Sequence, residues 1–251
     1  MSNWFDWGGA GYARYRPDYP PALATALAAL APDRGLAVDV GCGNGQFTRL
    51  LAGSFDAVAG VDPSADQIAH AVPDPRVTYH QAPAEALPLP DGCAALVTAT
   101  QAAHWFDLPA FYAEARRIAA PGAVIALVSY GVARLAPGPI NDRLARFHDI
   151  DIGPWWPAER HHVENGYADL PFPFAPLPVP PMAIERMWTA AQLLGYVGTW
   201  SAVRRAGEAG EGQRLDRFAD HLLPLWGAPA VARAIGWPIS VRAGRLQAAA
   251  A

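Results

Sequence analysis

Apolar and amphipathic segments alternate along the first half of this chain. Apolar runs with the length of strands lie at residues 38–40, 57–61, 94–100 and 123–129, and a further strand of mixed composition is predicted at 76–80. Between them, apolar residues recur at helical spacing, as over residues 21–31 and in the segment that follows Asp107. This alternation predicts a doubly wound α/β fold around a mostly parallel sheet.

The second half follows a different pattern. Residues 131–185 contain six prolines within 171–181 and no legible strand–helix unit, so we expect a lid or substrate wall inserted after the fifth strand. Helices are predicted over residues 188–206, with a break at Gly195, and over 213–223. Two last apolar runs, 231–237 and 239–246, are separated by Pro238 and predict a closing pair that makes the sheet seven-stranded.

We therefore expect one domain over residues 1–251. Its predicted parts are an amino-terminal helical cap (1–35), a ligand-binding core (36–130), the lid insertion (131–210) and a last helix with the closing strands (211–251).

A glycine-rich turn joins the first strand to its helix. Gly41, Gly43 and Gly45 let the backbone adopt conformations closed to other residues and approach a ligand, with Asn44 between them. The following helix turns its positive end toward that ligand, which favours an anionic group such as a carboxylate. Asp62 follows Gly41 by twenty-one residues, the separation at which an acid after the second strand binds a ribose.

These residues resemble the first motif of the class I S-adenosylmethionine-dependent methyltransferases, namely an acid, G-x-G-x-G and a later acid. The resemblance implies that the glycine turn faces the methionine part of the cofactor, that Asp39 orients this amino acid part, and that Asp62 holds the ribose. A nicotinamide-dependent oxidoreductase fits less well, because Gln46 stands where the dinucleotide fingerprint has its last glycine.

Further segments resemble the trans-aconitate methyltransferase-like branch, whose core is a methyltransferase type 11 domain. The sequence Y-A-R-Y-R-P-D-Y-P is similar to a segment that closes over the methionine end, and residues 81–88 are similar to one that lines the adenine. The cofactor-binding residues that the resemblance implies, beyond those of the first motif, are Tyr12, Tyr15, Arg16, Pro63, Ala84, Glu85 and Gln101. Pro83 replaces the acid that many members place against the adenine amino group.

Charge and composition limit the kinds of binding partner that we expect. The net charge of −4 and the absence of lysine runs give no reason to expect nucleic acid or an anionic membrane as partner. No early segment has the form of a signal peptide or a membrane span, so we expect a cytoplasmic protein. The aromatic amino-terminal segment and the proline-rich lid suggest an enclosed pocket, so we expect a monomer that acts on a small molecule. His161 and His162 are adjacent without a spaced third ligand, so we expect no metal.

His104, after the fourth strand, is the best-placed candidate for a base; its alternative role is packing in the cofactor or substrate wall. Candidate substrate-contacting aromatic residues are Trp105, Tyr130, Trp155, Trp156, Tyr167 and Trp200, for each of which ordinary packing is the alternative. The resemblance implies S-adenosylmethionine as methyl donor, S-adenosylhomocysteine as product, and O-methylation of a carboxylate or hydroxyl. A non-catalytic protein that only binds the cofactor remains the alternative, since such motifs report binding alone.

Overall fold

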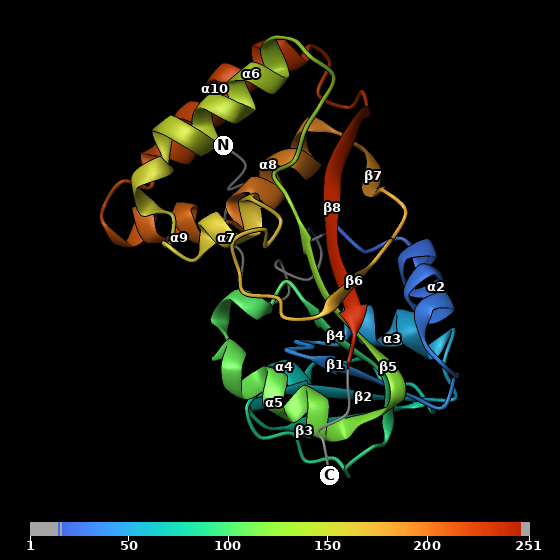
Figure 1. Cartoon of the computed structure of the whole chain (residues 1–251). Coiled ribbons are helices and arrows are strands. Elements are labelled where there is room, and N and C mark those ends of the chain that lie inside the picture. The colour runs from blue at the N-terminus through green and yellow to red at the C-terminus, as the bar shows by residue number, and fades with distance from the viewer. Residues whose placement is uncertain (1–14, 16, 247–251) are drawn as a thin grey trace. The chain divides into compact units, whose positions relative to one another are not determined.

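The computed structural model describes residue 15 and residues 17–246 of the chain (Figure 1). These residues form two compact units, which we treat separately. The sheet unit contains residues 18–131, 161–183 and 238–246, and the helical unit contains residues 132–160 and 184–237 together with residues 15 and 17.

The sheet unit is built on parallel strands that follow one another along the first half of the chain. The strands are β1 (Leu36–Val40), β2 (Ala57–Asp62), β3 (Val77–Gln81), β4 (Ala94–Thr100), β5 (Ala119–Tyr130), β6 (Ala175–Leu177) and β8 (Arg233–Arg245). Their order is β3-β2-β1-β4-β5-β8-β6, with parallel pairing from β3 to β5 and antiparallel pairing of β8 with β5 and β6. The doubly wound, mostly parallel sheet is thus confirmed, with β1 next to β4 where the strand order reverses.

Helices cover both faces of this sheet. They are α2 (Pro21–Leu30), α3 (Gln46–Ala52), α4 (Ala65–Ala69), the short turn η1 (Ala103–Trp105), α5 (Leu108–Ile118) and α7 (Arg160–Glu164). In Figure 1, α2 and α3 lie together on one side of the sheet and α5 lies on the other. The first six residues of β4 are buried, as the apolar run predicted for a strand covered on both faces.

The end of the chain differs from the sequence prediction. Instead of a strand pair interrupted by Pro238, residues 233–245 form the single strand β8. Proline lacks an amide hydrogen but suits an extended backbone, and the Pro238 carbonyl accepts the N–H of Gly131 at 2.9 Å. The prediction of a closing pair was therefore wrong, and the described residues form an eight-stranded sheet in which β7 (Met182–Trp188) also pairs with β8.

The helical unit contains most of the segment that showed no strand–helix pattern. Its elements are α6 (Pro139–Arg146), η2 (Phe147–Asp151), η3 (Gly153–Trp155), α8 (Ala190–Gly198), α9 (Ser201–Glu208) and α10 (Gln213–Trp226). The predicted helix at 188–206 is divided, but at Thr199 and Trp200 and not at Gly195, which stays inside α8. In the described part of the chain, no helix combines the length and the apolarity needed to cross a bilayer.

Candidate functional site

The glycine turn has the backbone conformation that its sequence predicted. Gly41, Gly43 and Gly45 have φ angles of 71°, 54° and 80°, in the left-handed region that favours glycine. The end of β2 fixes the start of the turn, because the Val61 carbonyl accepts the N–H of Gly41 at 2.7 Å and that of Cys42 at 3.1 Å. The turn is therefore tied to both strands at the carboxyl edge of the sheet.

Each glycine lacks a side chain for a different reason. A Cβ at Gly41 would overlap the Cβ of Ala102, and one at Gly45 would overlap the hydroxyl of Tyr79. At Gly43 the nearest atom, Oε1 of Gln67, would lie 3.6 Å away, an ordinary contact. Protein atoms therefore occupy the space beside the outer two glycines, whereas the space beside Gly43 is free of close protein atoms.

The carboxylate of Asp62 joins the glycine turn to the end of β2. Its Oδ2 accepts the N–H of Gly43 at 2.8 Å and its Oδ1 accepts the N–H of Ser64 at 2.9 Å. Each carboxylate oxygen can accept more than one hydrogen bond, so this 9% exposed side chain keeps capacity for donors from a ligand. A hydroxyl group of a ligand that lay beside the Gly43 amide could donate a further hydrogen bond to this carboxylate.

Asp39 lies buried at the end of β1, beneath the glycine turn. It is 1% exposed, and its two oxygens accept the hydroxyls of Thr48 at 2.7 Å and Thr98 at 2.8 Å. Burial raises the pKa of Asp39 to about 6, although the two threonine hydrogen bonds act in the opposite direction. Asp39 therefore links β1 to α3 and β4 beneath the turn, and its expected role toward the amino acid part of a cofactor stays a prediction.

Cys42 is not a candidate nucleophile despite its place in the turn. Burial raises the pKa of its thiol well above the usual range, and the nearby carboxylates of Asp39 and Asp62 act in the same direction. The thiol therefore stays protonated, and its Sγ lies 3.5 Å from the Gly43 carbonyl oxygen as a weak donor.

The segment between β3 and β4 carries Ala84 and Glu85. Ala84 is buried, and Glu85 Oε1 accepts the N–H of Asp107 at 2.9 Å, next to the start of α5. One oxygen of Glu85 thus holds the segment in place. Pro63 is exposed, and its carbonyl accepts the side-chain amide of Gln81 at 3.3 Å, which ties the end of β2 to β3.

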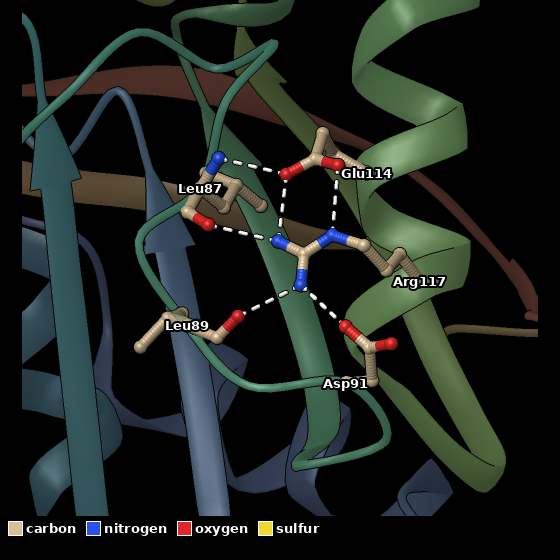
Figure 2. A network of polar contacts seen from close by, with 5 residues as sticks. All are labelled: Leu87, Leu89, Asp91, Glu114 and Arg117. Atoms are coloured by element: carbon tan, nitrogen blue, oxygen red, sulfur yellow. Dashed lines mark hydrogen bonds and ion pairs between the residues drawn. The ribbon is translucent and has the colours of Figure 1, made fainter.

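An arginine on α5 fixes the same segment from its other end (Figure 2). The guanidinium of Arg117 donates to the carbonyls of Leu87 and Leu89, both at 2.8 Å, and to Asp91 at 2.7 Å. Glu114 accepts from Arg117 at 2.8 and 2.7 Å and also accepts the N–H of Leu87 at 2.8 Å. The planar fork of one side chain thereby holds a loop that has no regular backbone pairing of its own.

Gln101, at the carboxyl end of β4, has a φ angle of 57°, which is uncommon for a residue with a side chain. Its N–H bonds to the Val128 carbonyl at 2.8 Å, and its side-chain amide donates to the Tyr130 carbonyl at 3.2 Å. Strained backbone of this kind is concentrated at functional sites. Gln101 lies at the carboxyl end of β4, and its role toward a cofactor stays a prediction.

His104 lies in η1, immediately after this strand end. Its Nδ1 is 2.9 Å from the hydroxyl of Tyr167, and its ring lies 4.8 Å from that of Trp105, centroid to centroid. Tyr167 is fully buried, and Arg242 on β8 donates to the carbonyls of Tyr167 and Leu170. One ring nitrogen of His104 is thus oriented by a rigidly held phenol, which is the arrangement that prepares an imidazole for proton transfer.

The structure brings only some candidate substrate residues together. Trp105, Tyr130 and Tyr167 belong to the sheet unit; Trp105 is 61% exposed, whereas Tyr130 is 5% exposed and packs its ring 5.7 Å from that of Tyr19. Trp105 is therefore the one of these three that presents most of its surface to solvent.

The other candidates belong to the helical unit and pack within it. Trp156 and Trp200 have ring centroids 5.6 Å apart, and the guanidinium of Arg214 lies 4.5 Å from the ring centroid of Trp155. Packing within the unit accounts for these contacts.

Among the candidate cofactor residues near the amino terminus, the structure describes Tyr15, whose ring lies against Gly195 of α8. Tyr12 and Arg16 lie outside the described residues.

Sequence reasoning missed several residues that hold the site. Thr48 and Thr98 meet Asp39 from different elements, and Tyr79 closes the turn at Gly45. Arg117 belongs to no motif that the sequence analysis identified. Residue types alone could not reveal these partners, because strand register and helix rotation decide which distant side chains meet.

Comparisons with known proteins point to one kind of protein. A family model described as a methyltransferase domain matches residues 38–127. A Dictyostelium discoideum protein named as a candidate methyltransferase is 30% identical over 220 residues, which cover 86% of this chain and 83% of that protein. A malonyl-[acyl-carrier protein] O-methyltransferase of Pectobacterium atrosepticum is 34% identical over 128 residues, 50% of this chain and 49% of that protein.

One solved structure is similar over nearly the whole chain. It is that of a candidate type II methyltransferase from Anaeromyxobacter dehalogenans, with a TM-score of 0.88 and 46% sequence identity. The match covers 93% of this chain and 99% of that one. The similarity therefore includes both units and not the glycine turn alone.

Proposed function

This chain belongs to the class I S-adenosylmethionine-dependent methyltransferases, and from that premise we propose that it transfers a methyl group from S-adenosylmethionine to a small-molecule acceptor. The observation that carries the proposal is the pairing of Asp62 with the open Gly43 at the adjoining ends of β2 and β1. A carboxylate beside exposed backbone at this edge suits a ligand that contains both a ribose and an amino acid.

The residues at this edge fit the cofactor part by part. Asp62 would accept the ribose hydroxyls, and the backbone at Gly43 and Asn44 would meet the methionine carboxylate. The segment with Ala84 and Glu85, held by Arg117, would line the adenine, and Gln101 would stand beside the reacting end. A Cβ at Gly43 would meet no protein atom closer than 3.6 Å, so the protein leaves space beside this glycine for a ligand.

The bound cofactor would supply an electrophilic methyl group on a sulfonium, so the chain mainly has to align the acceptor and exclude water. Alignment of this kind supplies about 7 to 11 kcal/mol in well-oriented reactions. A carboxylate acceptor needs no base, whereas a hydroxyl acceptor has to lose a proton. His104, with Nδ1 held by Tyr167, is our candidate base for a hydroxyl acceptor.

We propose O-methylation, as in the trans-aconitate methyltransferase-like branch. Similarity to the malonyl-[acyl-carrier protein] O-methyltransferase over half of this chain supports transfer to oxygen. The negative net charge of −4 favours a small acceptor over nucleic acid.

The test is calorimetric titration with S-adenosylmethionine and S-adenosylhomocysteine, with NAD as the control ligand. We expect binding of the first two and none of NAD. Asp62→Ala should weaken binding by about 100-fold, because it removes charged hydrogen bonds worth about 1.5 to 3 kcal/mol each. Asp56→Ala, at an exposed aspartate just before β2, is the matched control and should bind like the parent protein.

Unchanged affinity in Asp62→Ala would overturn the ribose assignment. Methyl transfer is then assayed with a panel of small carboxylic acids and phenols. Tight cofactor binding without transfer to any acceptor class would favour the non-catalytic alternative.

A further inference from the structure

Three potential metal ligands converge on the surface of the sheet unit, apart from the glycine turn. His161 and His162 lie in α7, and Asp169 lies in the turn that follows. The Asp169 Oδ2 is 2.8 Å from Nε2 of His161 and 2.7 Å from Nδ1 of His162. The ligand atoms of the three residues all lie within 4.8 Å of one another.

The backbone holds this cluster together. The chain reverses at Gly166 and Tyr167, whose φ angles are 68° and 64°, and the Tyr167 N–H bonds to the His162 carbonyl at 2.7 Å. Tyr167 is fully buried, and Arg242 binds its carbonyl and that of Leu170. Asp169 is thus carried back to the two histidines by a turn that is fixed on both sides.

The sequence analysis expected no metal because no third ligand follows the histidines at a recognised spacing. The reversal supplies that ligand, since Asp169 lies seven residues after His162 and yet touches both rings. Histidine at adjacent positions on a helix normally points in two directions. Here a single carboxylate oxygen lies between the two imidazole nitrogens.

We propose that His161, His162 and Asp169 form a binding site for a divalent transition-metal ion, with Zn²⁺ as the preferred ion. Two imidazoles and a carboxylate are a ligand set typical of three-ligand zinc sites. With Zn–ligand distances of about 2.0 to 2.1 Å, ligand atoms in a tetrahedral site stand about 3.3 Å apart. Each nitrogen would therefore move about 0.5 Å away from the Asp169 oxygen, and the two nitrogens, which lie within 4.8 Å of each other, would move closer together.

Exposure and ligand type define which ion the site takes. His161 and Asp169 have side chains that are 67% and 33% exposed, so water can complete the coordination. Imidazole ligands favour Zn²⁺, Ni²⁺ and Co²⁺ over the hard ions Mg²⁺ and Ca²⁺. A bound ion would fasten α7 to the turn that carries Tyr167, the partner of His104.

The experiment uses the full chain without an affinity tag, freed of metal by a chelator and gel filtration. Zn²⁺ is titrated calorimetrically, and Co²⁺ is added in parallel because its visible absorption reports imidazole coordination. We expect one equivalent of Zn²⁺ with micromolar affinity, no binding of Mg²⁺, and at least a tenfold loss of Zn²⁺ affinity in His161→Gln and in Asp169→Asn.

His70→Gln is the matched control. His70 is also exposed, and its Nδ1 lies 3.6 Å from Oδ1 of Asp66. Among the described residues, no third potential metal ligand joins this pair. Its substitution should leave Zn²⁺ binding unchanged. The proposal is overturned if one equivalent does not bind, if His161→Gln and Asp169→Asn bind like the parent, or if His70→Gln loses affinity equally. Circular dichroism confirms that each variant is folded.

Discussion

At the scale of single residues, Gly41 and Gly43 allow a direct test of what the glycine turn does. Gly43→Ala should fold, with a cost of about 1 to 2 kcal/mol for a Cβ in the left-handed region, but should lose most cofactor affinity. Gly41→Ala should be far less stable, because its Cβ would overlap Ala102. Urea unfolding and calorimetric titration measure the two effects. Equal stability of both variants would contradict this distinction.

The buried carboxyl of Asp39 predicts a pH dependence of stability. Its pKa is raised from 3.8 to about 6 in the folded chain, so the folded state binds its proton more tightly than the unfolded state does. This contribution is fully present below about pH 4 and is lost as the pH rises through 6. Relative to Asp39→Asn, the unfolding free energy of the parent should fall by about 3 kcal/mol between pH 3.5 and 7.

Urea unfolding of both proteins at each pH checks this dependence. Asp56→Asn controls for the loss of one exposed carboxylate. A parent–variant difference for Asp39→Asn that stays constant across the pH range would show that the carboxyl ionises alike in both states.

The hydrogen bond between His104 and Tyr167 can be separated from ordinary packing by two tyrosine variants. Tyr167→Phe and Tyr112→Phe each remove a hydroxyl from a buried ring, the second one bonded to the Pro171 carbonyl at 2.7 Å. Both should lose about 1 kcal/mol of stability. Only Tyr167→Phe should change the nitrogen chemical shifts of His104 and, with a hydroxyl acceptor, lower kcat by about tenfold.

Nitrogen NMR of the histidine rings gives the first measurement without any substrate. If Tyr112→Phe altered His104 to the same extent, the effect would be a general loosening of the sheet unit. If neither variant altered it, Tyr167 would not orient the imidazole.

The sequence identified this site unevenly, and the reason is physical. The left-handed backbone of Gly43 was predicted because this conformation favours glycine. Asp62 was proposed from its spacing to the glycine turn, and its contact with a ribose stays a prediction. The partners of Asp39 were not found, since Thr98 lies fifty-nine residues away and only strand register brings it close. A motif thus indicates candidate ligand-binding residues but not the residues that hold them in place.

At the scale of elements, the loop between β3 and β4 depends on α5 through Arg117. Arg117→Gln should raise amide exchange at residues 86–92 by about tenfold, because the carbonyls of Leu87 and Leu89 lose their donors. Cofactor affinity should fall by about tenfold, since this loop would line the adenine. Hydrogen exchange with mass spectrometry and calorimetric titration provide the two measurements.

The neighbouring arginine of α5 is a close control for this change. The guanidinium of Arg116 lies 4.8 Å from the ring centroid of Phe174, so Arg116→Gln removes the same charge from the same helix. It should leave exchange in the loop unchanged. Matching increases in both variants would mean that α5 as a whole, and not the Arg117 fork, sets the mobility of the loop.

Predicted elements were most reliable where one residue pattern has one structural solution. The runs at 57–61 and 94–100 became β2 and β4 because parallel buried strands need continuous apolar sequence. Pro238 was interpreted as a break, yet β8 continues through it, because an extended backbone tolerates proline where no N–H is needed. β6, with three residues, is too short to leave a pattern.

At the scale of the whole molecule, the chain divides into two compact units, and the expectation of one domain with a lid stays a prediction. The sequence could not show the division, since residues of each unit alternate along the chain and no linker separates them. Strand β8 supplies residues 233–237 to the helical unit and 238–245 to the sheet unit. If one unit unfolds, its part of β8 unfolds as well. The remaining part of β8, in the other unit, then loses its continuation.

We therefore expect the two units to unfold together, and the tryptophans allow this to be measured. Trp105 is the sole tryptophan within residues 18–131, 161–183 and 238–251, and Trp4 and Trp7 lie outside the described residues. With all three replaced by phenylalanine, the fluorescence reports the helical unit. S-adenosylhomocysteine at 100 times its Kd should stabilise the sheet unit by about 2.7 kcal/mol. The fluorescence midpoint should rise with the circular dichroism midpoint, because unfolding of one unit is linked to the other through β8. If the fluorescence transition stayed in place while the other moved, the units would unfold independently, and the bound cofactor would leave the helical unit unaffected.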